Sequence, residues 1–133
     1  MDAHLLIVPV AALAGPWLLW PLEQVLPFPV VIEEGFKLGL VAWALKHSDR
    51  GVGWGYLSLI GLGFGMSETI LYLFNALHSG ETGAYWLRLV TTVPMHVVTV
   101  FVVGWGLKVR LPWLGLVVAV LIHVGFNRLV RGL

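Results

Sequence analysis

Residues 30–46 read VVIEEGFKLGLVAWALK and place two adjacent carboxylates and a lysine inside an otherwise apolar segment. An ionised side chain is costly in hydrocarbon, so Glu33, Glu34 and Lys37 need partners or a function there. Ionisable residues in membrane segments usually face the interior of a helix bundle or an aqueous cavity. The segment therefore predicts a membrane helix that contributes to a buried polar site.

The whole chain has the composition of an integral membrane protein. Of its 133 residues, 59% are hydrophobic and 11% are charged, and the mean hydropathy is +0.91. Soluble domains contain about 25% charged residues, so this chain has too little polar surface to cover a water-facing globule. The net charge of +1 is uninformative, and no basic patch suggests a nucleic-acid partner. The absence of cysteine excludes thiol nucleophiles and cysteine-ligated zinc.

Five apolar runs predict five helices, because each run approaches the about 20 residues that span the hydrocarbon. The runs cover roughly residues 4–20, 28–46, 54–77, 85–107 and 112–131. Residues 1–133 are therefore expected to form one domain, an all-α integral membrane protein built as a compact bundle of about five transmembrane helices. Asp2 stands where a signal peptide would carry positive charge, so we expect the first helix to be retained.

The loop cations predict how these helices are oriented in the membrane. Lys46 and Arg50 lie in the second connection, and Lys108 and Arg110 lie in the fourth. Cytoplasmic loops are enriched in lysine and arginine. The pattern predicts a multi-pass protein with its N-terminus inside and its C-terminus outside.

Glycine spacing predicts which helices approach each other closely. Gly35 and Gly39 on the second helix, and Gly61 and Gly65 on the third, are pairs of the small-xxx-small type. Such pairs allow two backbones to pack closely in lipid. We therefore expect the second and third helices to be in contact.

Polar side chains on four of the predicted helices fall at one level of the membrane. At about 1.5 Å per residue, most lie between about 8 and 16 Å below the outer surface. Several are spaced i, i+4, which places them on one face of their helix. The set comprises Glu33, Glu34, Lys37, Glu68, His96, His123 and Asn127, with Arg88 nearer the surface as an interfacial charge or a partner for a glutamate. This agreement in depth predicts a single site.

Four motifs in this order resemble those of the PrsW-type glutamic intramembrane proteases, which are related to CAAX prenyl endopeptidases and bacteriocin-processing membrane proteases. They are EEGFK (Glu33 to Lys37), FGMSE (Phe64 to Glu68), His96 within RLVTTVPMHVV, and HVGFN (His123 to Asn127). The resemblance covers residues 31 to 127, in a chain shorter than expected for PrsW. It implies hydrolysis of a peptide bond in a membrane-anchored protein or peptide, such as an anti-sigma factor, in the cytoplasmic membrane of a prokaryote.

The paired carboxylates supply a candidate general base. A carboxylate that is partly removed from water beside a second carboxylate becomes a stronger proton acceptor. We expect Glu33 to activate water, and Glu34 and Lys37 to set its charge and orientation. This mechanism requires no cofactor.

The remaining polar residues have supporting roles in this hypothesis. His96 would stabilise or protonate the reacting group. His123 and Asn127 would donate hydrogen bonds to the developing oxyanion. Glu68 would position His96 or share a proton with the paired glutamates.

A metal site is the first alternative that the residues leave open. Glu33, Glu34, Glu68, His96 and His123 together offer carboxylate and imidazole ligands suited to zinc or non-haem iron. Neither the H-E-x-x-H pattern of zincins nor the Glu-x-x-His pair of di-iron bundles occurs in the sequence. Zinc is therefore the less expected cofactor.

Two further alternatives use the same segments differently. Ser67 within GMSE is similar to the serine of rhomboid proteases, but Glu68 occupies the position where those enzymes have glycine. Ser67 is therefore interpreted as a packing hydroxyl. A small proton- or cation-conducting protein would also need buried ionisable groups, although no inverted repeat suggests a transporter.

Overall fold

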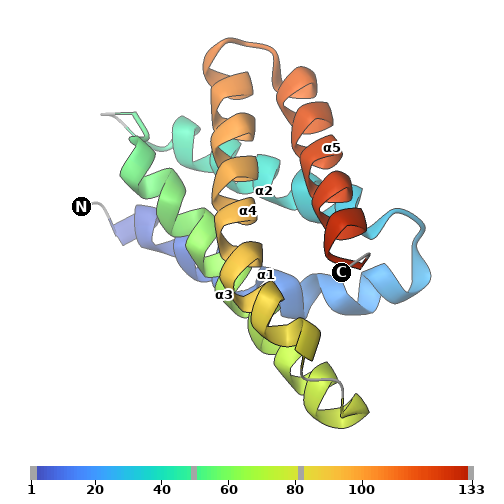
Figure 1. The fold of residues 1–133 in the computed structure, drawn as a ribbon. Helices are drawn as coiled ribbons and strands as arrows, with labels where there is room; N and C mark the ends of the chain where they lie inside the picture. The colour runs from blue at the N-terminus through green and yellow to red at the C-terminus, as the bar shows by residue number, and fades with distance from the viewer. Residues whose placement is uncertain (1–2, 49–50, 81–82, 132–133) are drawn as a thin grey trace.

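The computed structural model describes residues 3–48, 51–80 and 83–131 of the chain, and these are almost entirely helical (Figure 1). The helices are α1 (Ala3–Val25), α2 (Pro29–Lys46), α3 (Trp54–Ser79), α4 (Gly83–Lys108) and α5 (Pro112–Arg131). The described ranges contain no strand, which confirms the predicted all-α class. Asp2 and Arg50 lie outside the described residues.

Four of the five helices, α1, α3, α4 and α5, are long and apolar enough to cross a membrane. The exception is α2, because its 18 residues include Glu33, Glu34, Lys37 and Lys46. Helices α4 and α5 lie side by side, and α2 crosses them at a steep angle and contacts both (Figure 1). One face of the charged helix is therefore covered by neighbouring helices, which supply both packing and polar partners.

Helix α1 extends further than the sequence indicated. It was predicted to end at residue 20, but it continues to Val25 and contains Pro9, Pro16 and Pro21. A proline removes one backbone hydrogen bond from a helix, and in membrane helices neighbouring groups compensate for that loss. The predicted end at residue 20 was therefore wrong. As a consequence, Glu23 belongs to a helix and not to a loop.

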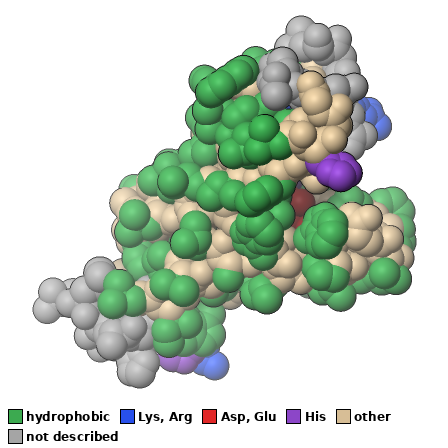
Figure 2. All heavy atoms as spheres, turned by 90° about the horizontal axis from the view of Figure 1, so that it is seen from below, with side chains coloured by type: hydrophobic (Ala, Val, Ile, Leu, Met, Phe, Trp, Pro, Cys, Tyr) green, Lys and Arg blue, Asp and Glu red, His purple; other side chains and the backbone are tan. Residues whose placement is uncertain are grey.

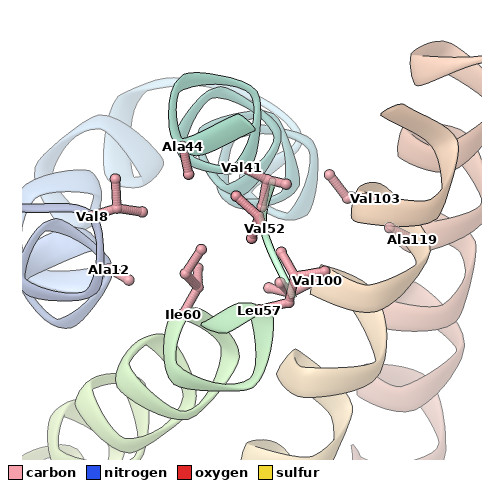
Figure 3. Close-up of a cluster of buried hydrophobic side chains, with 10 residues drawn as sticks. All are labelled: Val8, Ala12, Val41, Ala44, Val52, Leu57, Ile60, Val100, Val103 and Ala119. Carbon is pink, nitrogen blue, oxygen red and sulfur yellow. The ribbon is translucent and has the colours of Figure 1, made fainter. Parts of the chain in front are cut away.

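A cluster of fully buried apolar side chains joins all five helices (Figure 3). Val41 of α2 and Val100 of α4 are both inaccessible to solvent, and each lies one helical turn from a polar residue of the predicted site, Lys37 and His96 respectively. Packing at this level fixes the rotation of the helices and so aims the neighbouring polar side chains inward. The cluster consists of Val8, Ala12, Val41, Ala44, Val52, Leu57, Ile60, Val100, Val103 and Ala119.

Gly61 and Gly65 of α3 pack against α4 and not against α2. A Cβ atom at Gly61 would lie 2.6 Å from the Cα of Val97, and one at Gly65 would lie 2.8 Å from the Cα of Val93. Around Gly35 and Gly39 of α2 there is no such contact within 4 Å. The predicted glycine contact between the second and third helices is therefore wrong.

Helices α2 and α3 instead meet through larger side chains near the glutamates. The rings of Phe36 and Phe64 lie 6.4 Å apart, and the Lys37 ammonium lies 4.8 Å from the centre of the Phe64 ring. These contacts bring α2 onto α3 at the level of the polar residues. The proximity of the two helices that the sequence suggested is thus present, with a different physical cause.

The two connections that carry basic residues lie at the same end of the molecule. The ammonium of Lys108, at the end of α4, lies 4.6 Å from the centre of the Trp54 ring, at the start of α3. The α2–α3 and α4–α5 connections are therefore neighbours. At the opposite end, Trp17 of α1 packs edge-on against Phe74 of α3, with ring centres 6.1 Å apart.

Candidate active site

Lys37 lies at the centre of the polar cluster. Its ammonium donates to Oε1 of Glu34 at 2.6 Å, to Oγ1 of Thr99 at 3.0 Å and to Nδ1 of His96 at 2.6 Å. The side chain is completely buried. A buried ammonium needs acceptors for all three of its protons, and these contacts provide them. Lys37 therefore ties α2 to α4 at the site.

The partners of His96 determine which nitrogen carries its proton. An ammonium group can only donate, so Nδ1 must accept the hydrogen bond from Lys37. The neutral ring then carries its proton on Nε2, which donates to Oε2 of Glu68. The ring also packs against Phe64, with ring centres 5.0 Å apart. His96 is thus fixed in one orientation between α2 and α3.

A second histidine is held by the paired glutamates. Nδ1 of His123, on α5, lies 2.7 Å from Oε1 of Glu34 and 3.7 Å from Oε2 of Glu33. Because an ionised carboxylate only accepts, Nδ1 carries the proton and donates to Glu34. Nε2 of His123 is then left with a free lone pair. The His123 and His96 rings meet edge to face, with centres 5.1 Å apart.

Glu33 differs from Glu34 in facing a cavity. A cavity of about 210 Å³ lies between α1 and α3, and both Glu33 and Glu68 line it. Its other lining residues are Pro16, Trp20, Glu23, Gln24, Leu71, Tyr72 and Asn75. The Oε2 atom of Glu33 has no hydrogen-bond partner among the described residues. A water molecule needs about 30 Å³ and polar partners, so the cavity can hold water next to this oxygen.

The surface view agrees with this arrangement. Figure 2 shows hydrophobic side chains over most of one face and an acidic side chain recessed between them. One acidic side chain is therefore visible from this side of the molecule.

Two predicted site residues do not contact this cluster in the described part of the chain. Asn127 lies one turn beyond His123 on α5, is partly exposed, and forms no hydrogen bond with the other site residues. Arg88 forms no ion pair with a glutamate; its guanidinium lies 4.3 Å from the centre of the Tyr72 ring. Because Tyr72 lines the cavity, Arg88 is near the site without belonging to its centre.

Four residues near the site were not predicted. Thr99 follows His96 by three residues, and its hydroxyl accepts from Lys37 and donates to the His96 carbonyl oxygen. That spacing was a usable signal. The cavity is also lined by Glu23, Tyr72 and Asn75. Glu23 was missed because its position was predicted to lie in a loop. Nothing in the local sequence distinguishes Tyr72 and Asn75.

The donor atoms of four side chains are close enough to share a metal ion. One ligand atom from each of Glu33, Glu68, His96 and His123 lies within 4.8 Å of the others, and all four residues are buried. The unpaired oxygen of Glu33 and the free Nε2 of His123 fit such a role directly. Nε2 of His96 joins them in the tautomer that carries the proton on Nδ1, which would then donate to the nitrogen of an uncharged Lys37. The donor set therefore fits a divalent metal.

The fold and site together define a multi-pass membrane protein with a buried carboxylate–histidine centre next to a cavity of about 210 Å³. Residues 24–131 match the family described as PrsW family intramembrane metalloprotease. The chain therefore belongs to the PrsW family of intramembrane metalloproteases, a family of peptide hydrolases. No curated protein and no solved structure is significantly similar to the chain.

Proposed function

We propose that the protein is an endopeptidase that cleaves a membrane-anchored protein or peptide, with Glu33 accepting a proton from the attacking water. The observation that carries this proposal is the unpaired Oε2 of Glu33 in a residue that lines the cavity. The proton taken from water then passes to the nitrogen of the leaving amine. A positioned general base of this kind contributes about 10²–10⁴-fold to the rate.

The neighbouring charges keep Glu33 and the histidines in place. Glu34 accepts from Lys37 and His123 through the same oxygen, Oε1, so it positions both partners. Its Oε2 is also unpaired among the described residues, but Glu34 does not line the cavity, and Glu33 is therefore proposed as the group that meets water. Lys37 compensates one of the two carboxylates, and its contact with His96 fixes that ring. Asn127, on the same helix as His123, is proposed to donate a hydrogen bond to the substrate's developing oxyanion.

The description of the family as metalloproteases favours a metal-dependent reaction over the metal-free one. We assign Glu68, His96 and His123 as the residues that would hold the ion, since two histidines and one glutamate form the set used in zinc peptidases of the thermolysin type. A bound divalent metal would polarise the substrate carbonyl. Glu33, close to all three, then remains available as the base. Glu34 supports His123 as its hydrogen-bond acceptor, the usual outer partner of a histidine ligand.

The orientation and substrate follow from the same features. Because both basic connections lie at one end, that end is assigned to the cytoplasm, which gives the N-in/C-out arrangement. The cavity then lies towards the external half of a prokaryotic cytoplasmic membrane. A single-span protein cut near that surface, such as an anti-sigma factor, would fit. The motifs EEGFK and HVGFN also support a relation to the CAAX prenyl endopeptidases.

A cleavage assay on the purified protein tests the proposal. Single-span peptides are incubated in detergent with the wild type, with and without a chelator, and with the Glu33→Gln and Ser67→Ala variants. We expect cleavage by the wild type, loss with chelator and with Glu33→Gln, and no change with Ser67→Ala. Ser67 is a matched control because it is buried next to Glu68 and its hydroxyl has no partner. Cleavage that survives in Glu33→Gln would remove the assigned base.

A further inference from the structure

An apolar pocket of about 340 Å³ lies between α1 and α3, beside the cavity at the glutamates. Trp17 and Phe74 form part of its wall and contact each other edge to face. The remaining lining residues are Trp20, Leu71 and Asn75. Pockets that bind small apolar groups begin at about 300 Å³, so the volume is sufficient for a large side chain.

The pocket and the cavity are parts of one groove. Trp20, Leu71 and Asn75 line both of them. A chain segment that lies in this groove would therefore have one end at Glu33 and Glu68 and the other end among the tryptophans. We refer to the two together as the α1–α3 groove.

The polar part of the groove offers hydrogen-bond partners for an unfolded peptide. In hydrocarbon, every backbone N–H and C=O group must be satisfied, and a peptide bond that is to be hydrolysed cannot keep its helical partners. The Oε1 atom of Glu23 is buried and has no hydrogen-bond partner among the described residues. Glu23 lies just before the residues that match the family.

We propose that the α1–α3 groove binds the substrate as an extended segment, with a large apolar side chain beside the scissile bond in the pocket and a backbone N–H donating to Glu23. This inference rests on the proposed function and names the substrate's chemistry. The apolar lining would favour phenylalanine or leucine over alanine next to the cleaved bond. Amide side chains of Gln24 and Asn75 are available for the other backbone groups.

The chain contains a second apolar pocket that serves as a matched control. Trp54, Phe101, Val102 and Trp105 line it, with a volume of about 280 Å³. Its Trp54 and Phe101 rings also meet edge to face, with centres 5.1 Å apart. It shares no lining residue with the cavity at the glutamates. Binding of lipid or of any apolar peptide by surface crevices alone would involve both pockets equally.

Peptide binding is measured separately from cleavage. A fluorescent single-span peptide with a central phenylalanine, and the same peptide with alanine there, are titrated in nanodiscs against the wild type, Phe74→Ala and Phe101→Ala. We expect Phe74→Ala to weaken binding of the phenylalanine peptide about tenfold, the loss of part of one buried aromatic contact, and to abolish the preference over alanine. Phe101→Ala should change neither. Equal effects of the two variants, or none from Phe74→Ala, would overturn the pocket assignment.

Two variants of Glu23 test the hydrogen bond. Glu23→Leu removes the acceptor and should weaken binding about tenfold, whereas Glu23→Gln keeps a carbonyl oxygen and should bind within about threefold of the wild type. Equal losses in both would contradict the role of acceptor. Elution of each variant as a single species in size-exclusion chromatography verifies folding. Phe74→Ala is expected to fold because the Phe74 side chain is 60% exposed.

The outcomes separate the groove from the chemistry. Binding that depends on Phe74 without cleavage of any peptide would support the groove and refute the proposed function. Suppose instead that Glu33→Gln abolishes cleavage but Phe74→Ala leaves peptide binding unchanged. That result would support the proposed function and refute the groove. Absence of both binding and cleavage by the wild type would refute both.

Discussion

The ammonium of Lys37 lies 2.6 Å from Nδ1 of His96 and donates a hydrogen bond to it. One contact therefore connects the charged helix α2 with α4 and determines the proton position on the histidine that faces Glu68. The two residues are 59 positions apart in the sequence. Their contact explains why a lysine is retained in a fully buried position.

Lys37→Met is expected to destabilise the protein strongly. Removing one partner of a buried ion pair leaves an uncompensated charge, here Glu34, at a cost of about 3–5 kcal/mol. The measurement is the free energy of unfolding in mixed micelles. Lys46→Met, at the exposed end of the same helix, is the matched control and should change stability by less than about 0.5 kcal/mol. A similar loss in both variants would contradict the central role of Lys37.

Gly61→Ala is expected to destabilise the contact of α3 with α4. The new Cβ would lie 2.6 Å from the Cα of Val97, and overpacking of this kind costs about 1–3 kcal/mol. Gly39→Ala has open space and should be neutral or stabilising by up to about 1 kcal/mol, because alanine favours the helix more than glycine does. Thermal unfolding of the two variants checks this, and the reverse order of stability would refute the described packing.

Glu34→Gln is expected to weaken metal binding without removing a ligand. Glu34 accepts the Nδ1–H of His123 as a charged carboxylate. The amide oxygen of glutamine is an uncharged and weaker acceptor, and weakening such an outer partner costs up to about 10–100-fold in metal affinity. Competition with a chromogenic zinc chelator measures the affinity. Asn127→Ala serves as the control, because Asn127 lies one turn away on the helix of His123 and makes no hydrogen bond to it. Unchanged zinc affinity in Glu34→Gln would show that His123 does not hold the ion.

Thr99→Val is expected to reduce stability modestly and to slow cleavage. The substitution keeps the shape of the side chain but removes the acceptor for one proton of Lys37, and one such bond contributes about 1 kcal/mol. Thr99→Ser should restore both properties. Thr91→Val, which removes a hydroxyl bonded only to the carbonyl oxygen of Leu87, should have no effect on cleavage. Equal rates for Thr99→Val and wild type would exclude Thr99 from a functional role.

Much of the fold followed from the sequence because hydrocarbon imposes simple rules. The starts of α2, α3 and α5 agree with the predicted starts of the apolar runs to within one residue, since Pro29, Trp54 and Pro112 follow turn-rich segments. The end of α1 did not follow, because the effect of Pro21 depends on neighbouring helices. Likewise, Gly61 pairs with α4 because of helix rotation, which the spacing of glycines along one helix does not encode.

The ionisable residues of the candidate site could be predicted from the sequence, because burying a charge in an apolar segment is costly. Glu33, Glu68, His96 and His123 were identified from their cost in an apolar segment, and the structure brings them together. Burying a neutral residue such as Tyr72 has no comparable cost in free energy. Its position at the cavity could therefore be recognised only from the structure. The structure was also needed to distinguish the role of Glu33 from that of Glu34, since the roles depend on which carboxylate faces the cavity.

The central claim is that Glu33 acts as a base beside a metal held by Glu68, His96 and His123. It is tested most directly by measuring bound zinc and peptide cleavage on the same preparations of wild type, Glu33→Gln and Glu68→Gln. We predict that Glu33→Gln retains about one zinc per chain while cleavage falls about 10²–10⁴-fold, and that Glu68→Gln loses both. Cleavage at the wild-type rate by Glu33→Gln, or loss of zinc from it, would contradict this assignment.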